Sequence, residues 1–351
     1  MCRAARRSYL SGVKHDATQP SETPDFLNHD RPPVPDLVVP RALLPFHLGD
    51  RPVRGRLVRL GPLAHALLSR HDYAPDVGRL LGQALALTAG LAGALKYRGS
   101  FSLQAKGDGA VPMLLADCTD GGALRGYARV AAAPAGADGG GAAAPPTGEA
   151  GALLGGGYLA FTCDQGPDMD RYQGIVPIEG ETLAEMTGTY FATSEQLRAW
   201  VRLACRRVPE GEGPAGGEWR ASALVLERVA PAGGLAEIGE EEAEEAWRTA
   251  LALAATVTEA ELLDDALPPE RLLHRLFGSE GAVVADRARA LSYGCRCSRA
   301  RLASVLGGFG ADDLDHMAEG GDGAITMTCE FCNVDFRFDR AEVQGAGGKR
   351  A

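Results

Sequence analysis

Apolar and polar residues alternate along much of the first 235 residues, which predicts a domain rich in β-strands. The alternation is clearest over 101–105 and 111–115, and a Gly-Asp-Gly turn at 107–109 separates the two runs. A period of two is typical of strands with one buried face, and the glycine turn favours an antiparallel pair. Further strands are expected at 54–60, 124–130, 158–163, 197–205 and 222–229.

Helical spacing of apolar residues marks two helices in the same region, at 76–95 and 181–191. With the strands they predict an α+β fold, in which an N-terminal α/β domain with a mostly antiparallel sheet spans 37–235. Residues 1–36 are polar and rich in proline, so we expect a disordered leader. The Ala/Gly/Pro-rich run at 131–150 is expected to be a flexible insertion in this domain.

The pattern changes near Glu237, where acidic residues become dense. Trp247 belongs to one short amphipathic helix, and the residues from Leu272 to Phe277 form a second that Gly278 would end. Helices with such narrow apolar faces need a larger surface to pack on. Residues 236–294 are therefore predicted to form a metastable helical linker.

Composition and charge exclude several classes of protein. The longest apolar run, Ala84–Leu95, is much shorter than the roughly 20 residues of a membrane span, so we expect no membrane partner. The net charge is −10 and no basic stripe stands out, which argues against a nucleic-acid partner. Without a Walker motif, a dinucleotide fingerprint or a Ser/His/Asp constellation, no enzyme activity is predicted. No apolar signal region precedes the domain, so a cytoplasmic location is expected.

Half of the eight cysteines lie close together near the C-terminus. Cys295 and Cys297 form a C-x-C pair, and Cys329 and Cys332 form a C-x-x-C pair. Two close pairs joined by a loop can surround a tetrahedral ion, and four thiolates favour Zn²⁺. The segment around them has few large apolar residues, so its fold is expected to depend on the metal.

The cysteine spacing alone leaves two roles for the metal open. A structural zinc ribbon usually has C-x-x-C at both ends, whereas the first pair here is C-x-C. Metal-bound thiolates are also nucleophilic toward oxidants, so a redox switch stays open as the second interpretation, although the residues alone favour a structural zinc. By contrast, Cys118, Cys163 and Cys205 lie in or beside predicted strands and are interpreted as buried structural residues.

Several short motifs follow one another in a fixed order along the chain. They include Gln104–Gly109 (QAKGDG), Leu124–Val130 (LRGYARV) and Tyr172–Pro177 (YQGIVP), and they end with Cys295-Arg-Cys297-Ser298 and Cys329-Glu-Phe-Cys332. The ordered set resembles the redox-regulated holdase chaperones called the 33 kDa heat-shock protein or 33 kDa chaperonin. The resemblance covers roughly residues 37–340, omits a C-terminal tail at 341–351, and favours the redox switch over a purely structural zinc.

The resemblance implies an ATP-independent chaperone that protects unfolding proteins during oxidative stress. In the reduced protein, Cys295, Cys297, Cys329 and Cys332 would hold one Zn²⁺ within a redox domain at 295–340, and the chaperone would be off. Oxidation would form the disulfides Cys295–Cys297 and Cys329–Cys332, release zinc and unfold the linker, so that client proteins bind. The active form would be a homodimer through the N-terminal domain. The alternative is a zinc-ribbon interaction module with a purely structural zinc.

Overall fold

The chain divides into two compact units in the computed structural model. One unit comprises residues 34–296 with 327–336, and the other comprises 297–326 with the residues from 337 onward. The residues that the structure describes are 34–94, 99–131, 145–166, 169–208, 217–229, 239–318, 323–340 and 343.

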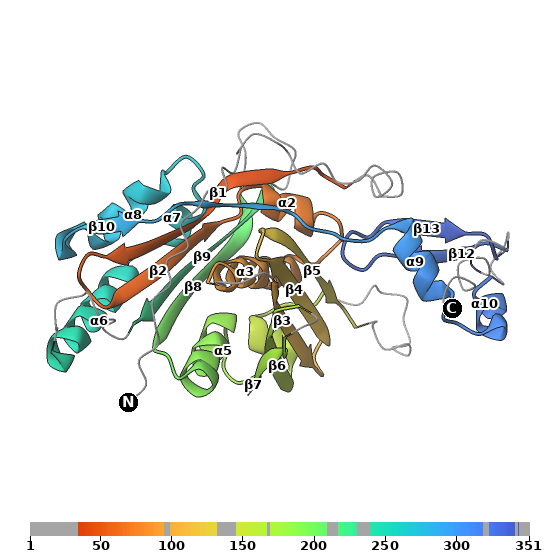
Figure 1. Ribbon diagram of the computed structural model, residues 1–351, viewed down its shortest axis with the longest axis horizontal. Helices are drawn as coiled ribbons and strands as arrows, with labels where there is room; N and C mark the ends of the chain where they lie inside the picture. The colour runs from red at the N-terminus through yellow and green to blue at the C-terminus, as the bar shows by residue number, and fades with distance from the viewer. Residues whose placement is uncertain are drawn as a thin grey trace, which may run out of the picture. The chain divides into compact units, whose positions relative to one another are not determined.

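A single mostly antiparallel sheet forms the larger unit (Figure 1). Its strand order is β7-β6-β3-β4-β5-β11-β1-β2-β9-β8, and β10 also pairs with β1. Among the described strands of this sheet, β11 is parallel to β5 and the other pairings are antiparallel. The predicted α+β fold is therefore confirmed. The strands are β1 (Val38–Leu48), β2 (Val53–Arg59), β3 (Ser100–Gly107), β4 (Met113–Thr119), β5 (Ala123–Arg129), β6 (Gly157–Asp164), β7 (Tyr172–Pro177), β8 (Ala199–Val208), β9 (Glu218–Arg228), β10 (Val283–Ala285) and β11 (Arg289–Tyr293).

Helix α3 (Pro75–Ala92) packs on one face of the sheet and forms the main core with it. Proline in the first turn suits a helix start, because its fixed φ is already helical and its missing N–H would have no partner there. The helix approaches β8 closely, since a Cβ at Gly82 would lie 2.3 Å from the Cys205 sulfur. The apolar run that predicted this helix is thus buried in a globular core. Among the described helices, none is both long and apolar enough to cross a membrane.

Three helices of the predicted linker cover the opposite face of the sheet and create a second core. Adjacent residues of one strand point to opposite faces, and Val225 lies in the main core whereas Leu224 and Leu226 lie in the second. Phe46 of β1 stacks on Phe277, with ring centroids 5.8 Å apart. Figure 1 shows these helices on the side of the sheet away from α3. They are α6 (Glu240–Ala254), α7 (Glu259–Leu263) and α8 (Pro269–Phe277).

The smaller unit has little apolar core of its own. Ser298 accepts a hydrogen bond from the Arg301 amide and caps the first helix of the unit. Phe338 is fully buried, and the Arg299 guanidinium lies 4.7 Å from the centre of its ring. The elements of this C-terminal region are α9 (Arg299–Leu306), α10 (Ala311–Ala318) and the paired strands β12 (Ile325–Thr328) and β13 (Asp335–Phe338).

Several elements escape the sequence pattern. Pro40 and Pro45 interrupt the alternation of β1, whose register against β11 shifts between Val39 and Leu43. The linker contains the strands β10 and β11 in addition to its predicted helices. Residues 1–33 of the predicted leader and 132–144 of the predicted insertion lie outside the described residues. The end of that insertion begins a helix, α4 (Ala150–Leu154). Helix α2 (Pro62–Leu68) was also not predicted, whereas α5 (Leu183–Tyr190) was expected.

Candidate metal centre

The structure brings together the four cysteines that the sequence singled out. The sulfur atoms of Cys295, Cys297, Cys329 and Cys332 all lie within 4.8 Å of one another. The sulfurs of Cys295 and Cys329 are 3.7 Å apart. Zn–S bonds of about 2.3 Å place tetrahedral sulfur ligands about 3.8 Å apart, so the spacing suits a four-thiolate metal ion. Cys297 is half-buried and the other three are buried, which would shield an ion from water.

Local backbone structure fixes both cysteine pairs. The C-x-C pair follows β11, where the Gly294 amide donates to the Leu124 carbonyl at 2.8 Å. The C-x-x-C pair lies in the turn between β12 and β13, closed by the Asn333 amide, which donates to the Cys329 carbonyl at 2.8 Å. Asn333 has a φ of 53°, a left-handed conformation that asparagine tolerates better than most residues. The turn therefore presents both of its cysteines to one point.

The residue between Cys295 and Cys297 attaches the first pair to the sheet. Arg296 donates from Nη2 to Asp117 Oδ1 of β4 at 2.5 Å. Arg125 of β5 donates from Nε to the same oxygen at 3.1 Å. Asp117 is only 7 % exposed, so removing either guanidinium would leave a buried carboxylate with a single partner. The C-x-C pair is thus held by an ion-pair network in the larger unit.

The two residues between Cys329 and Cys332 attach the second pair to β5. The ring of Phe331 contacts Tyr127 edge to face, with centroids 5.1 Å apart, and the Arg125 guanidinium lies 4.2 Å from the centre of the same ring. Glu330 pairs with Arg129 at 3.0 Å. We call Arg296, Glu330 and Phe331 the anchor residues. All of these contacts lie within the larger unit.

The remaining described cysteines stay outside the centre. Burial raises the pKa of the Cys118 thiol to about 12, and it also raises the pKa of Cys205. Thiols with raised pKa values are poor nucleophiles and poor metal ligands. The interpretation of Cys118, Cys163 and Cys205 as buried residues of the sheet is confirmed.

Sequence reasoning missed the partners of the anchor residues. Asp117, Arg125 and Tyr127 lie far from the cysteines along the chain and show no spacing that relates them to a metal site. The one signal was that Arg125 and Tyr127 belong to the family-like motif at 124–130, which carries no indication of contact with the cysteines.

The fold and the cysteine cluster together define a class: a protein with an antiparallel sheet domain and a C-terminal four-cysteine centre that can hold a metal ion. A sequence model of the family described as Hsp33 protein matches residues 42–339. A 33 kDa chaperonin of Caulobacter vibrioides is 41 % identical over 294 residues, which is 84 % of this chain and 93 % of that protein.

Two further comparisons agree with this match. A 33 kDa chaperonin of Pseudomonas aeruginosa is 37 % identical over 310 residues, 87 % of this chain and 95 % of that protein. The crystal structure of the 33 kDa chaperonin from Thermotoga maritima shares the fold with a TM-score of 0.67 at 20 % identity, covering 87 % of this chain and 97 % of that one. The chain belongs to the Hsp33 protein family.

Proposed function

We propose that this protein is a redox-regulated, ATP-independent holdase chaperone, off when reduced and metal-bound and on when oxidised. The observation that carries the proposal is the joint placement of the four cysteines and the anchor residues. The sulfurs surround one point, while Arg296, Glu330 and Phe331 contact β4 and β5. A change at the sulfurs would therefore act on the contacts with the sheet.

The donor set fits one Zn²⁺, held by Cys295, Cys297, Cys329 and Cys332. Zinc bound there would keep the four thiols deprotonated and add its binding free energy to folding of the cysteine-bearing segment. The smaller unit needs such support because its buried apolar residues are few. Zinc thus serves as the off-state cofactor of the proposed switch.

In the proposed activation step, Cys295 bonds to Cys297 and Cys329 bonds to Cys332. Each new S–S bond removes two electrons from a pair of thiolates, and one equivalent of peroxide takes them up and is reduced to water. The sulfur atoms then cease to be thiolate ligands, so the metal site is lost. The C-terminal segment loses the support on which its fold depends.

The linker would respond because it leads directly into the centre. β11 ends at Tyr293, two residues before Cys295. Once the anchor residues leave β4 and β5, β11 would keep only its pairings with β1 and β5. We propose that these pairings then break and that α6 to α8 follow. Their departure would uncover Phe46, Leu224 and Leu226 on the sheet, together with the apolar faces of the helices themselves. Such a surface, normally buried, suits the capture of unfolding proteins.

We infer the remaining properties from the same reading. The partners are unfolding client proteins, and a second copy of the chain in the active state. The protein is proposed to bind its clients without catalysing a reaction, and to have no nucleic-acid or membrane partner. It is proposed to act in the cytoplasm under oxidative stress. The names of the relatives support the chaperone role, since both are called 33 kDa chaperonins.

Light scattering from a heat-unfolding client protein tests the proposal. We compare the reduced, zinc-loaded chain with the same chain treated with peroxide and heat, and expect only the oxidised form to suppress aggregation. Reductant should reverse the change. Equal suppression by both forms would contradict the switch and favour the alternative, an interaction module with a structural zinc.

A further inference from the structure

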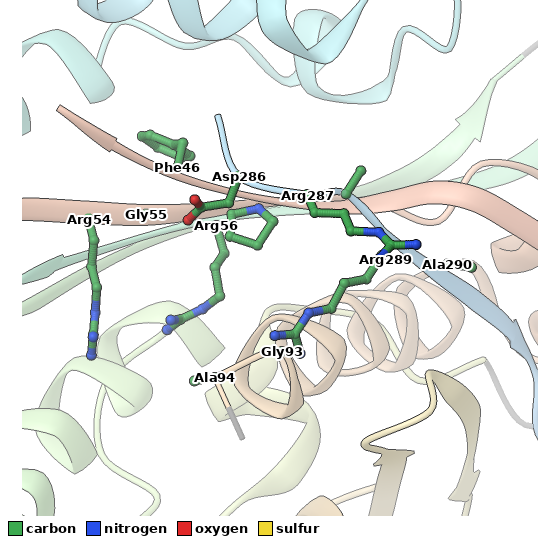
Figure 2. Close-up of a pocket in the computed structure, with 12 residues that line it drawn as sticks. Phe46, Arg54, Gly55, Arg56, Gly93, Ala94, Asp286, Arg287, Arg289 and Ala290 are labelled. Atoms are coloured by element: carbon green, nitrogen blue, oxygen red, sulfur yellow. The ribbon is translucent and has the colours of Figure 1, made fainter. Parts of the chain in front are cut away.

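A cleft of about 850 Å³ lies on the larger unit, away from the cysteine centre. Arginines dominate its wall: Arg54 and Arg56 come from β2, Arg287 comes from the segment that joins β10 to β11, and Arg289 begins β11. Figure 2 shows the side chains of Arg54, Arg56 and Arg289 extending from the strands to the side on which Gly93 and Ala94 lie, at the end of α3, whereas the Arg287 side chain is directed away from Arg54 and Arg56. No sequence pattern predicted this grouping, because the two pairs of arginines are far apart along the chain.

One buried carboxylate accounts for part of the positive charge. Glu227 is 4 % exposed and accepts a hydrogen bond from Arg54 Nε at 2.7 Å and another from Arg56 Nη2. Burial alone would raise the pKa of Glu227, but the two guanidiniums prevail and lower it, so the carboxylate is ionised. The buried Nε of Arg56 still has no hydrogen-bond partner. Arg54 keeps its two Nη groups available.

The other two arginines have no acidic partner. Arg287 and Arg289 are exposed, and neither side chain makes an ion pair or hydrogen bond with the part of the chain that the structure describes. Asp286 is the one acid among the residues that line this cleft. Four guanidiniums thus face Asp286 and Glu227, which leaves a local positive excess in a chain whose net charge is −10. Like charges around one cleft repel one another unless an anion lies between them.

A smaller pocket of about 420 Å³ continues the cleft and shares Arg54, Arg56 and Ala94 with it. Aromatic side chains form much of its wall, among them Phe101, Tyr172 and Tyr190, and Glu195 also lines it, where it accepts a hydrogen bond from the Tyr190 hydroxyl. Apolar pockets of this size with a few charged groups at one end are typical of small-molecule sites. Arginines beside an aromatic pocket suit a ligand with a negatively charged end and a flat apolar body.

We propose that this composite cleft binds a small organic phosphate, with its phosphate on Arg289 and the neighbouring Arg54 and Arg56, and an aromatic group in the smaller pocket. The planar guanidinium fits phosphate oxygens through paired hydrogen bonds, which favours phosphate over a monovalent anion such as chloride. The aromatic wall favours a ring over an aliphatic chain, because ring pairs add an attraction beyond area burial. No part of this assignment uses the cysteine centre.

A regulatory consequence follows, and it rests on the proposed function. Arg289 begins β11, a strand of the linker that is proposed to leave the sheet, whereas Arg54 and Arg56 belong to β2, which is proposed to stay. A bound phosphate would bridge the two and stabilise the off state by mass action. Oxidation that undocks the linker would in turn separate the arginines and release the ligand.

Isothermal titration calorimetry on the reduced, zinc-loaded full chain tests the site. The probes are 1-naphthyl phosphate, inorganic phosphate and 1-naphthol, which separate the charged end from the ring. We expect naphthyl phosphate to bind at least about tenfold more tightly than either partial probe, since each end adds a charge-assisted or apolar contact. Binding should weaken as salt rises, because screening reduces the attraction of exposed arginines.

Variants assign the binding to the arginines. Arg289→Ala should weaken naphthyl phosphate binding by about tenfold. Arg287→Ala should weaken it less, because the Arg287 side chain is directed away from Arg54 and Arg56. The control is Arg202→Ala on β8, an exposed arginine that lines neither pocket, and it should leave the affinity unchanged. Circular dichroism confirms that the three variants fold alike. An equal loss of affinity for naphthyl phosphate in Arg202→Ala and Arg289→Ala would overturn the proposal, as would the absence of naphthyl phosphate binding to the unaltered chain.

The holdase assay keeps this test separate from that of the switch. Arg289→Ala should still suppress aggregation after oxidation, because the arginine is not part of the cysteine centre or of its anchors. If naphthyl phosphate does not bind but oxidation still activates the chaperone, only the proposed binding site is rejected. If naphthyl phosphate binds but oxidation does not activate the chaperone, the redox switch is rejected, and with it the stabilisation of the off state by the ligand. The binding site in the cleft would still be supported.

Discussion

At the scale of single residues, the position of the cysteine centre depends on the side chains between its cysteines. Phe331 contacts both Tyr127 and Arg125, and Arg296 shares Asp117 with Arg125. Arg125 therefore links the two cysteine pairs through one side chain. This arrangement explains how a local change in sulfur chemistry can reach the sheet.

Phe331→Ala should loosen the second cysteine pair from β5 without removing a sulfur. The lost ring and cation–π contacts are worth about 1 kcal/mol, so activation at limiting peroxide should be about fivefold faster. Zinc content should be unchanged. The matched control is Phe309→Ala, which truncates an exposed phenylalanine of the smaller unit. Identical activation rates for the two variants and the unaltered chain would contradict the role of the anchor.

We expect the contribution of Glu227 to the free energy of unfolding to depend on pH. Its folded pKa is lowered, so its stabilising effect is fully present above the unfolded value of about 4.3 and declines as pH falls through the folded value. Glu227→Gln leaves Arg56 buried without its counter-charge and should cost about 3–5 kcal/mol at pH 7. Thermal unfolding at pH 7 and pH 3.5 measures this cost. A loss of stability in Glu227→Gln that is equally large at pH 7 and pH 3.5 would contradict the ion-pair explanation.

Prediction from sequence succeeded for chemistry that lies close together along the chain. The two cysteine pairs are each within a few residues, so their spacing alone indicated a metal centre. Asp117, Tyr127 and the arginine cleft depend on contacts between distant segments, and nothing in a local pattern encodes those contacts.

At the scale of elements, the linker helices act as a cover for one face of the sheet. α6 and α8 bring Trp247 and Phe277 onto strands whose opposite face packs against α3. The acidic first turn of α6 stabilises that helix through its dipole but adds nothing to the apolar contact. Most of the docking free energy therefore comes from a small number of large side chains.

Phe277→Ala should weaken this cover selectively. Truncation of a fully buried phenylalanine costs about 3–5 kcal/mol, and here the cost falls on docking of α8. We expect measurable suppression of aggregation by the reduced variant, before any oxidant is added. Phe161→Ala removes an equally buried ring from the main core and should lower the unfolding temperature without this activity. Constitutive activity in both variants would show general loosening instead.

The strands and helices also show which parts of the fold cannot be predicted from local sequence patterns. Sequence patterns predicted β2 to β6, β8 and β9, and the alternation was clearest in β3 and β4, which the Gly-Asp-Gly turn separates. β1 was missed because Pro40 and Pro45 break its period, and β10 is only three residues long. The helices α6 and α8 were expected, whereas the apolar face on which they pack is a property of the assembled sheet.

At the scale of the whole molecule, the metal centre, the linker and the sheet form a proposed chain of dependence. The cysteines support the anchor residues, the anchors hold the end of β11, and β11 continues from the helices that cover the second core. Removing one cysteine should therefore affect residues far from it.

Cys329→Ser should lower zinc affinity and loosen the linker even under reducing conditions, because a hydroxyl is a poor zinc ligand. Zinc content after dialysis measures the first effect, and partial holdase activity measures the second. Cys205→Ala, which removes a buried sulfur from β8, should retain zinc and remain off until oxidised. Full zinc retention in Cys329→Ser would contradict the assignment of that ligand.

Hydrogen exchange tests the coupling of the centre to the linker most directly. Amide exchange is followed across 239–294 in the reduced, zinc-loaded chain and in the peroxide-treated chain, with zinc release and thiol loss measured on the same samples. The account predicts a large loss of protection in α6, α8 and β11 on oxidation, while β3 and β6 remain protected. Complete thiol loss and zinc release with unchanged protection across the linker would contradict it.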